Sequence, residues 1–153
     1  MDFVKNLEIV NRKATHLYFF EYTLEAGIAL RGTEIKSIRM GEVNMSDAFC
    51  SIDSKGLAVE HMHIGEYKNG TYNNHVPKRP RRLLIKGNEL RKLASKVKEA
   101  GYTIIPYRLY INERGFAKLE IALARGKKTF DKRETIKERD SQREIDRYMK
   151  MYK

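Results

Sequence analysis

The chain has 153 residues, and 31 Lys and Arg against 20 Asp and Glu give it a net charge of +11, which favours a polyanionic partner such as nucleic acid. Its single cysteine, Cys50, excludes an internal disulfide and a cysteine-rich zinc cluster. No apolar run approaches the length that spans a membrane, so we expect a cytoplasmic protein with no membrane partner.

Short runs rich in β-branched and aromatic residues predict a mainly β chain. We expect strands at 17–23, 28–30, 48–52, 57–64, 103–111 and 116–123. Gly-containing segments at 53–56 and 112–115 should connect the last two pairs of these strands as hairpins. Residues 1–9 are expected to form a loosely held terminus, and residues 25–27 a turn.

Two segments have the periodicity of helices. Thr33 is the predicted N-cap of a helix that ends at Gly41, and Asn88 of one that ends at Gly101. The second helix lies in segment 78–98, where nine Lys or Arg and one acid give a net charge of +8. A principal helix between the third and fourth main strands predicts a small closed OB-like β-barrel with two or three helices. Such barrels bind oligonucleotides, although the fold alone does not establish function.

The composition changes at the end of the predicted barrel domain, 1–130. Segment 126–133 combines a glycine, four cations and the aromatic ring of Phe130, which suits a nucleic-acid contact. The tail, 131–153, has too few apolar residues for a core, so we expect it to be disordered when free. A helical tail would align basic residues every fourth position and suits folding against a charged partner. A purely solubilising tail is the alternative.

Motifs in order along residues 11–133 resemble those of the SsrA-binding protein family, small protein B. The first are Asn11-Arg12-Lys13-Ala14 with His16 and Tyr18, Glu25-Ala26-Gly27-Ile28, Gly32-Thr33-Glu34-Ile35-Lys36-Ser37 and Asn44-Met45-Ser46-Asp47. The others are Asn74-His75-Val76-Pro77, Arg79 with Arg82-Leu83-Leu84, Gly126-Lys127-Lys128 and Asp131-Lys132-Arg133. Val76 and Arg82 depart from the pattern, since the family often has an acid at the first position and usually Lys at the second.

The resemblance implies an OB-type barrel that binds the tRNA-like end of transfer-messenger RNA during rescue of stalled ribosomes. It implies that Gly126–Lys128 and Asp131–Arg133 act with the tail at the decoding centre of the small subunit of the 70S ribosome. There the protein would take the place of the codon–anticodon duplex, with the tail helical in the vacant mRNA channel. Elongation factor Tu would be a partner through the RNA.

The resemblance and the charge pattern together assign two sets of residues. RNA binding is assigned to Asn11, Arg12, Lys13, His16, Glu25, Lys36, Asn74, His75, Arg79, Arg82 and Leu84. Contact with the ribosome is assigned to Gly126, Lys127, Lys128, Phe130, Asp131, Lys132, Arg133, Arg139, Arg143 and Arg147. Five cations of the first set would contact phosphate, which predicts a log–log salt slope of about -4 to -5. Phe130 would stack on a ribosomal base, or alternatively fold back on the barrel.

Other functions remain open from the sequence alone. Glu34 and Lys36 match the Glu-x-Lys pair of magnesium-dependent nucleases, and a general basic RNA chaperone is also compatible with the charge. His61 and His63 could bind a metal together with His16 or His75, but surface or core histidines are the better interpretation. We therefore predict a non-enzymatic RNA-binding protein, monomeric when free, with no cofactor and no metal.

Overall fold

The computed structural model describes residues 7–70, 73–99 and 101–127. The predicted domain boundary at residue 130 and the tail, 131–153, lie outside these residues. The elements are β1 (Glu8–Val10), α1 (Arg12–Leu17), β2 (Tyr18–Ile28), α2 (Gly32–Arg39), β3 (Val43–Asn44), β4 (Phe49–Asp53), β5 (Gly56–Glu60), β6 (His63–Ile64), β7 (Arg81–Leu84), α3 (Gly87–Val97), β8 (Tyr102–Ile111) and β9 (Ala117–Gly126).

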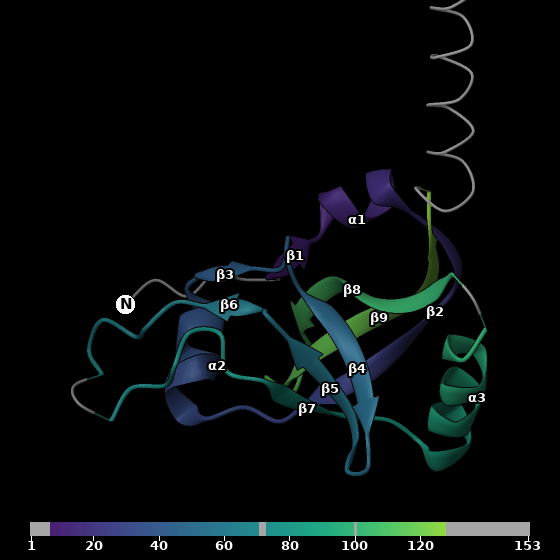
Figure 1. Cartoon of the computed structure of the whole chain (residues 1–153). Helices are drawn as coiled ribbons and strands as arrows, with labels where there is room; N and C mark the ends of the chain where they lie inside the picture. The colour runs from purple at the N-terminus through teal and green to yellow at the C-terminus, as the bar shows by residue number, and fades with distance from the viewer. Residues whose placement is uncertain (1–6, 71–72, 100, 128–153) are drawn as a thin grey trace, which may run out of the picture.

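The larger sheet closes into a ring of antiparallel strands (Figure 1). Its order is β8-β4-β5-β7-β2-β9, and β9 pairs with both β2 and β8 to close it. Strand β1 adds to β8 outside the ring, and β3 pairs with β6 as a separate ribbon. Helix α3 follows β7 and precedes the β8–β9 hairpin. This arrangement confirms the predicted mainly β fold.

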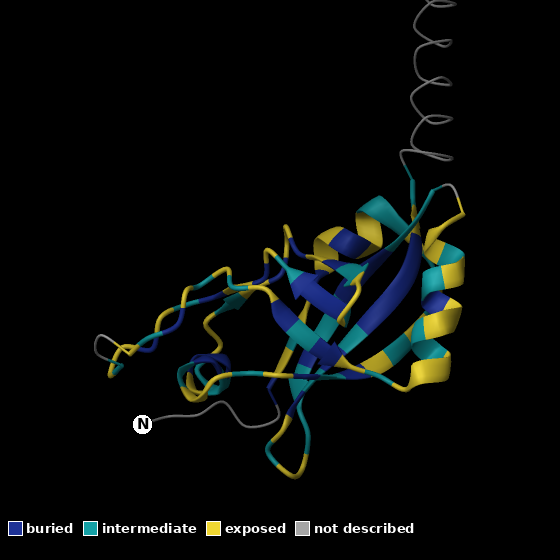
Figure 2. Cartoon of the chain, turned by 60° about the horizontal axis from the view of Figure 1, so that its bottom comes forward, coloured by how far each residue is buried: buried dark blue, intermediate teal, exposed yellow. Residues whose placement is uncertain are grey.

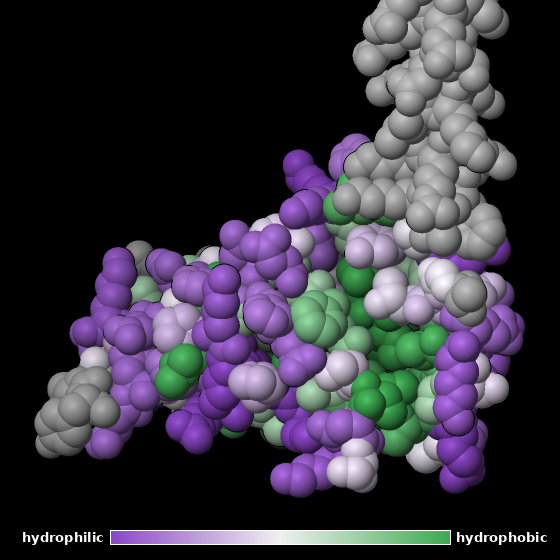
Figure 3. All heavy atoms as spheres, in the orientation of Figure 1, coloured by the Kyte–Doolittle hydropathy of each residue, from purple (hydrophilic) through white to green (hydrophobic). Residues whose placement is uncertain are grey.

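The core fills the inside of the ring because alternate residues of each strand point inward. Strand β9 shows the pattern, since Leu119, Ile121 and Leu123 are all buried. Leu93 of α3 is fully buried and joins the same cluster. Buried residues follow the strands, whereas exposed residues line the outer sides of the helices (Figure 2). Apolar atoms also gather between β4 and α3 on the face shown in Figure 3, which is otherwise largely hydrophilic.

Strand β2 is longer than predicted, and the turn predicted at 25–27 is wrong. Glu25, Ala26 and Gly27 continue the strand and pair with β9, because a partner strand far along the chain satisfies their backbone groups. A Cβ at Gly27 would lie 3.3 Å from Cβ of Leu84, so the missing side chain permits the close approach of β7. The predicted loose terminus, 1–9, is also wrong in part, since β1 pairs with β8.

Both helices start earlier than predicted, and α3 also ends earlier, at Val97 and not at Gly101. Arg31 is the N-cap of α2 and Lys86 that of α3, in place of Thr33 and Asn88. Helix α1 was not predicted at all. Both predicted hairpins are confirmed, as β4–β5 and β8–β9.

Candidate nucleic-acid interface

Asn11 is a structural residue that starts helix α1. Its side chain is 5% exposed, and its Nδ2 donates hydrogen bonds to the carbonyls of Met45 (3.1 Å) and Pro106 (3.0 Å). Its Oδ1 accepts from the backbone N–H of Ala14, which caps the helix. The observed role of Asn11 is therefore to fix α1 against the loop before β4 and against β8.

Helix α1 carries exposed cations beside the end of β9. Arg12, Lys13 and His16 are exposed on this helix. Lys127, the last described residue, donates its backbone N–H to the carbonyl of Leu17 at 2.8 Å. Two residues from the RNA-binding set and one from the ribosome-contacting set are thereby part of one basic surface, formed by Arg12, Lys13 and Lys127. We call it the α1 surface.

The rest of the ribosome-contacting set is described only in part. Gly126 pairs with Tyr18 at the end of β9, and Nζ of Lys127 lies 5.1 Å from the centre of the Phe19 ring. The remaining members lie outside the described residues: Lys128, Phe130, Asp131, Lys132, Arg133, Arg139, Arg143 and Arg147.

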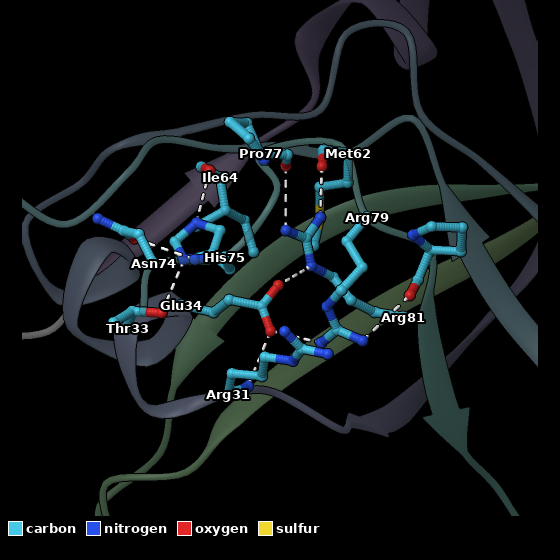
Figure 4. Close-up of polar contacts among 11 residues, drawn as sticks. Arg31, Thr33, Glu34, Met62, Ile64, Asn74, His75, Pro77, Arg79 and Arg81 are labelled. Carbon is cyan, nitrogen blue, oxygen red and sulfur yellow. Dashed lines mark hydrogen bonds and ion pairs between the residues drawn. The ribbon is translucent and has the colours of Figure 1, made fainter. Parts of the chain in front are cut away.

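A buried ion-pair network centres on Glu34 in the first turn of α2 (Figure 4). The side chain of Glu34 is fully buried. Its Oε1 accepts from the backbone N–H of Arg31 at 2.8 Å and from the guanidinium of Arg79 at 2.5 Å, while Oε2 accepts from Nε of Arg81. Arg81 is also fully buried and donates to the carbonyls of Met62 and Pro77, so β7 is tied to the loop before it.

The network keeps Glu34 ionised. Burial alone would raise the pKa of this carboxyl group, but hydrogen bonds from Arg79, from the Arg31 N–H and from Arg81 outweigh burial and lower the pKa below its ordinary value. Two guanidinium groups share one carboxylate, which leaves one net positive charge. The side chain of Arg79 is 27% exposed, so this charge reaches the surface at Arg79.

The nuclease interpretation of Glu34 and Lys36 does not fit this geometry. Both carboxylate oxygens of Glu34 already accept charged or backbone donors, and the group has no exposed surface on which a metal-bound water could meet RNA. Lys36 is exposed, with Nζ 5.4 Å from the centre of the Tyr67 ring, and side chains two positions apart on a helix do not face each other. Within the described ranges, no group of three or more His, Cys, Asp or Glu side chains is placed to hold a metal ion.

Asn74 and His75 organise the loop between β6 and β7. His75 is 2% exposed, and its Nε2 donates to the carbonyl of Ile64 at 2.9 Å, because a carbonyl can only accept. Its Nδ1 therefore accepts from the hydroxyl of Thr33, also at 2.9 Å. The Asn74 side chain bonds both the N–H (3.1 Å) and the carbonyl (2.8 Å) of Tyr67. His75 therefore holds the loop against α2 and β6, whereas Asn74 ties parts of the loop to one another.

The far end of β2 carries a different kind of surface. Leu84 is 63% exposed and lies beside Gly27 and Phe116, which is also 63% exposed, around a hollow of about 370 Å³. Arg82 points outward from β7, the strand that also carries Leu84. Its two terminal nitrogens donate to the two carboxylate oxygens of Asp53, at 2.9 and 2.8 Å. Hydrogen bonds from Arg82 are the main cause that lowers the pKa of Asp53 to about 2.

Glu25 lies on the outer face of the ring next to this end. The hydroxyl of Tyr110 donates to its carboxylate, and the guanidinium carbon of Arg108 lies 4.4 Å from the centre of the Tyr110 ring. Partial burial and then the hydrogen bond to Glu25 raise the pKa of Tyr110 to about 12. We call Glu25, Arg82, Leu84 and Tyr110 the β7 surface.

The predicted RNA-binding residues therefore do not form one patch. Strand β2 has 11 residues and spans roughly 33 Å, with the α1 surface at one end and the β7 surface at the other. Asn11 and His75 support loops and helices from inside, and the half-buried Asn74 holds its own loop together. Sequence reasoning missed Arg81 and Tyr110, which position Glu34 and Glu25. Arg81 could have been found from the in–out alternation of 81–84, had the strand been recognised.

Comparison with known proteins identifies the family. The sequence matches the family described as SmpB protein over residues 8–151. It is 51% identical to an SsrA-binding protein of Parabacteroides distasonis, over 95% of each chain, and to one of Christiangramia forsetii, over 99% of this chain and 97% of the other.

A solved structure described as "tmRNA-SmpB: a journey to the center of the bacterial ribosome" contains a chain 45% identical to this one. The two align with a TM-score of 0.69 over 82% of this chain and 87% of the other. In the described part of the protein, no helix has the length and apolar character needed to cross a membrane. From its sequence match and its fold, the chain belongs to the SmpB family.

Proposed function

We propose that this protein binds the tRNA-like end of transfer-messenger RNA and accompanies it to stalled ribosomes in trans-translation. The observation that carries the proposal is the 45% identical structural relative, whose description names both tmRNA and the bacterial ribosome. The relatives named SsrA-binding protein support the same RNA as the ligand.

The β7 surface has the chemistry to select an RNA by shape. Leu84, with Phe116 across the neighbouring hollow, offers apolar contact to an unstacked base, and the carboxylate of Glu25 can accept from base amino groups. The hydrogen bond from Tyr110 fixes the position of that carboxylate. A folded RNA with splayed loop bases is a better match to this surface than a regular duplex, whose base edges lie in the grooves.

The end of β9, where Lys127 meets α1, begins the proposed ribosomal side. Lys127 is fixed to α1 through the carbonyls of Thr15 and Leu17, so the segment that follows starts from a defined point on this helix. We propose that Lys128, Phe130 and Asp131–Arg133 continue from this point into the decoding centre and replace the missing codon–anticodon duplex. In the same proposal the tail, 131–153, becomes helical in the mRNA channel, and elongation factor Tu binds through the RNA.

Fluorescence anisotropy with the tRNA-like domain, and elongator tRNA as competitor, tests the proposal. Of the five cations predicted to contact phosphate, Arg82 is paired with Asp53 and Lys13 with Asp47, while Glu34 neutralises only one of its two arginines. About three net phosphate contacts remain, and they predict a log–log salt slope of about -2 to -3. Tight binding that survives excess elongator tRNA supports the proposal. Equal affinity for both RNAs would overturn it in favour of a general RNA chaperone.

A further inference from the structure

Two aromatic rings are stacked on the surface where β4 begins and β5 ends. The centroids of the Phe49 and His61 rings are 5.3 Å apart, with 26° between their planes. Phe49 is 37% exposed, and His61 is also exposed. The pair therefore presents aromatic surface to solvent that the core does not use. Exposed ring faces of this kind are the groups on which unpaired bases stack.

The backbone at His61 is held in an unusual conformation. His61 has φ of 60°, and among the described residues it is the only non-glycine residue with positive φ. Such conformations are uncommon outside glycine and persist where the surrounding structure holds them, often at binding sites. Here the conformation ends β5 and leaves the imidazole ring stacked on Phe49.

The stacked pair borders two hollows, of which the first is also lined by apolar side chains and the second is mostly polar. One, of about 180 Å³, is lined by Phe49 and Lys13, and the other, of about 240 Å³, by His61 and Lys78. Both are also lined by Ser46 and Asp47. Each hollow therefore combines one ring of the stack, one lysine and the same two polar side chains.

We propose that this stacked pair and its two hollows bind unpaired RNA nucleotides. The rings stack on bases, Lys78 neutralises an adjacent phosphate, and Ser46 and Asp47 accept hydrogen bonds from base amino groups. Nζ of Lys13 lies 3.5 Å from Oδ1 of Asp47 in an exposed ion pair, so Lys13 exchanges this partner for a phosphate when RNA binds. The net charge of +11 and Lys78 at the edge of the second hollow favour a polyanion over a protein partner. The inference extends the proposed function with a further RNA contact.

This site is separate from the β7 surface. Phe49 lines a hollow with Leu17 and Tyr18, at the α1 end of β2, whereas Leu84 pairs with Gly27 near the other end. Figure 1 shows the start of β4 and the end of β5 between α1 and the β3–β6 ribbon. An RNA held at the β7 surface would leave these rings accessible to a second RNA segment.

The test uses the full chain and two fluorescein-labelled probes, an adenine octanucleotide and an abasic chain of the same length. Phe49→Leu keeps an apolar side chain but removes the ring, and should weaken octanucleotide binding about tenfold. Phe49→Tyr keeps the ring and should bind within about twofold of wild type. The abasic chain offers only phosphates, so Phe49→Leu should bind it as wild type does.

A second variant separates binding from folding. Asn adopts positive φ more readily than most residues, so His61→Asn should keep or raise the melting temperature while it weakens octanucleotide binding. The proposal is overturned if Phe49→Leu and His61→Asn, both folded, bind the octanucleotide like wild type. It also falls if wild type binds the tRNA-like domain but not the octanucleotide, a result that leaves the proposed function intact. Octanucleotide binding without preference for the tRNA-like domain would instead overturn the proposed function alone.

Discussion

Replacement of Glu34 by Gln would break the buried ion-pair network with almost no change of shape. Glu34 and Arg81 are both fully buried, so the variant leaves the Arg81 guanidinium without its carboxylate and inside the protein. Gln at this position can still accept the Arg31 N–H that caps α2, so the helix start is preserved. The variant therefore tests the buried charge and little else.

The expected loss follows from the burial of each partner. Removing one member of a buried ion pair costs roughly 3–5 kcal/mol of unfolding free energy, because the other charge is left uncompensated. Arg79 is 27% exposed and can turn toward water, so Arg81 accounts for most of this loss. The free energy of unfolding of a native domain is only about 5–15 kcal/mol in total, so the variant should be folded but much less stable.

Urea unfolding followed by circular dichroism at pH 7 measures this difference. The control is Glu99→Gln, since Glu99 is exposed and lies 4.0 Å from Lys96, and it should lose less than about 1 kcal/mol. The pKa of Glu34 is lowered, so its contribution is complete above the ordinary value of 4.5 and is lost as the pH falls through the lower folded value. The gap between wild type and Glu34→Gln should shrink in that acid range. A loss of less than about 1 kcal/mol at pH 7 would refute the reasoning, because water would then be satisfying Arg81.

Three other predictions concern the surfaces. Asp53→Asn releases Arg82 and should raise affinity for the tRNA-like domain and steepen the log–log salt slope by about 0.9; an unchanged slope means that Arg82 contacts no phosphate. Glu25→Gln should lower the pKa of Tyr110 from about 12 toward 10 in an NMR titration, whereas an unchanged value would show that burial alone sets it. Deletion of 131–153 should leave the affinity for the tRNA-like domain within about threefold, because the tail is proposed to contact the ribosome and not this RNA. The same deletion should abolish ribosome rescue in a reconstituted assay. Loss of RNA binding would contradict the division into two surfaces.

The sequence predicts those parts of the fold that depend on local residues. The β4–β5 and β8–β9 hairpins were predictable because their turns contain Gly56 and Gly115, both with positive φ. Strand β7 was missed because Arg-Arg-Leu-Leu does not alternate between polar and apolar residues. Its burial does alternate, but one of the two buried positions is Arg81, whose charge is paired with Glu34. The turn predicted at 25–27 was wrong because pairing with β9, a distant segment, decides the conformation there.

The candidate sites were predictable in composition but not in exposure. Asn11, Asn74 and His75 are polar residues in family motifs, and nothing in the sequence distinguishes them from surface contacts. The structure shows that carbonyl groups distant in the chain, at Pro106 and Ile64 for example, accept their hydrogen bonds. The Phe49–His61 stack depends on the same kind of tertiary placement, since Phe49 pairs with Glu60 across the β4–β5 hairpin and His61 follows directly after it.

The closure of the ring by β9 also determines when the protein can fold. Tyr18 and Gly126 are paired, and 126 minus 18 gives a separation of 108 residues. At a synthesis rate of about 5–20 residues per second, roughly 5–20 s pass between the two positions. Until β9 is made, the edges of β2 and β8 that it covers are unpaired, and such edges promote aggregation. If the protein acts in trans-translation as proposed, a factor for failed translation thus needs its own synthesis to continue without interruption through Gly126 before its ring can close.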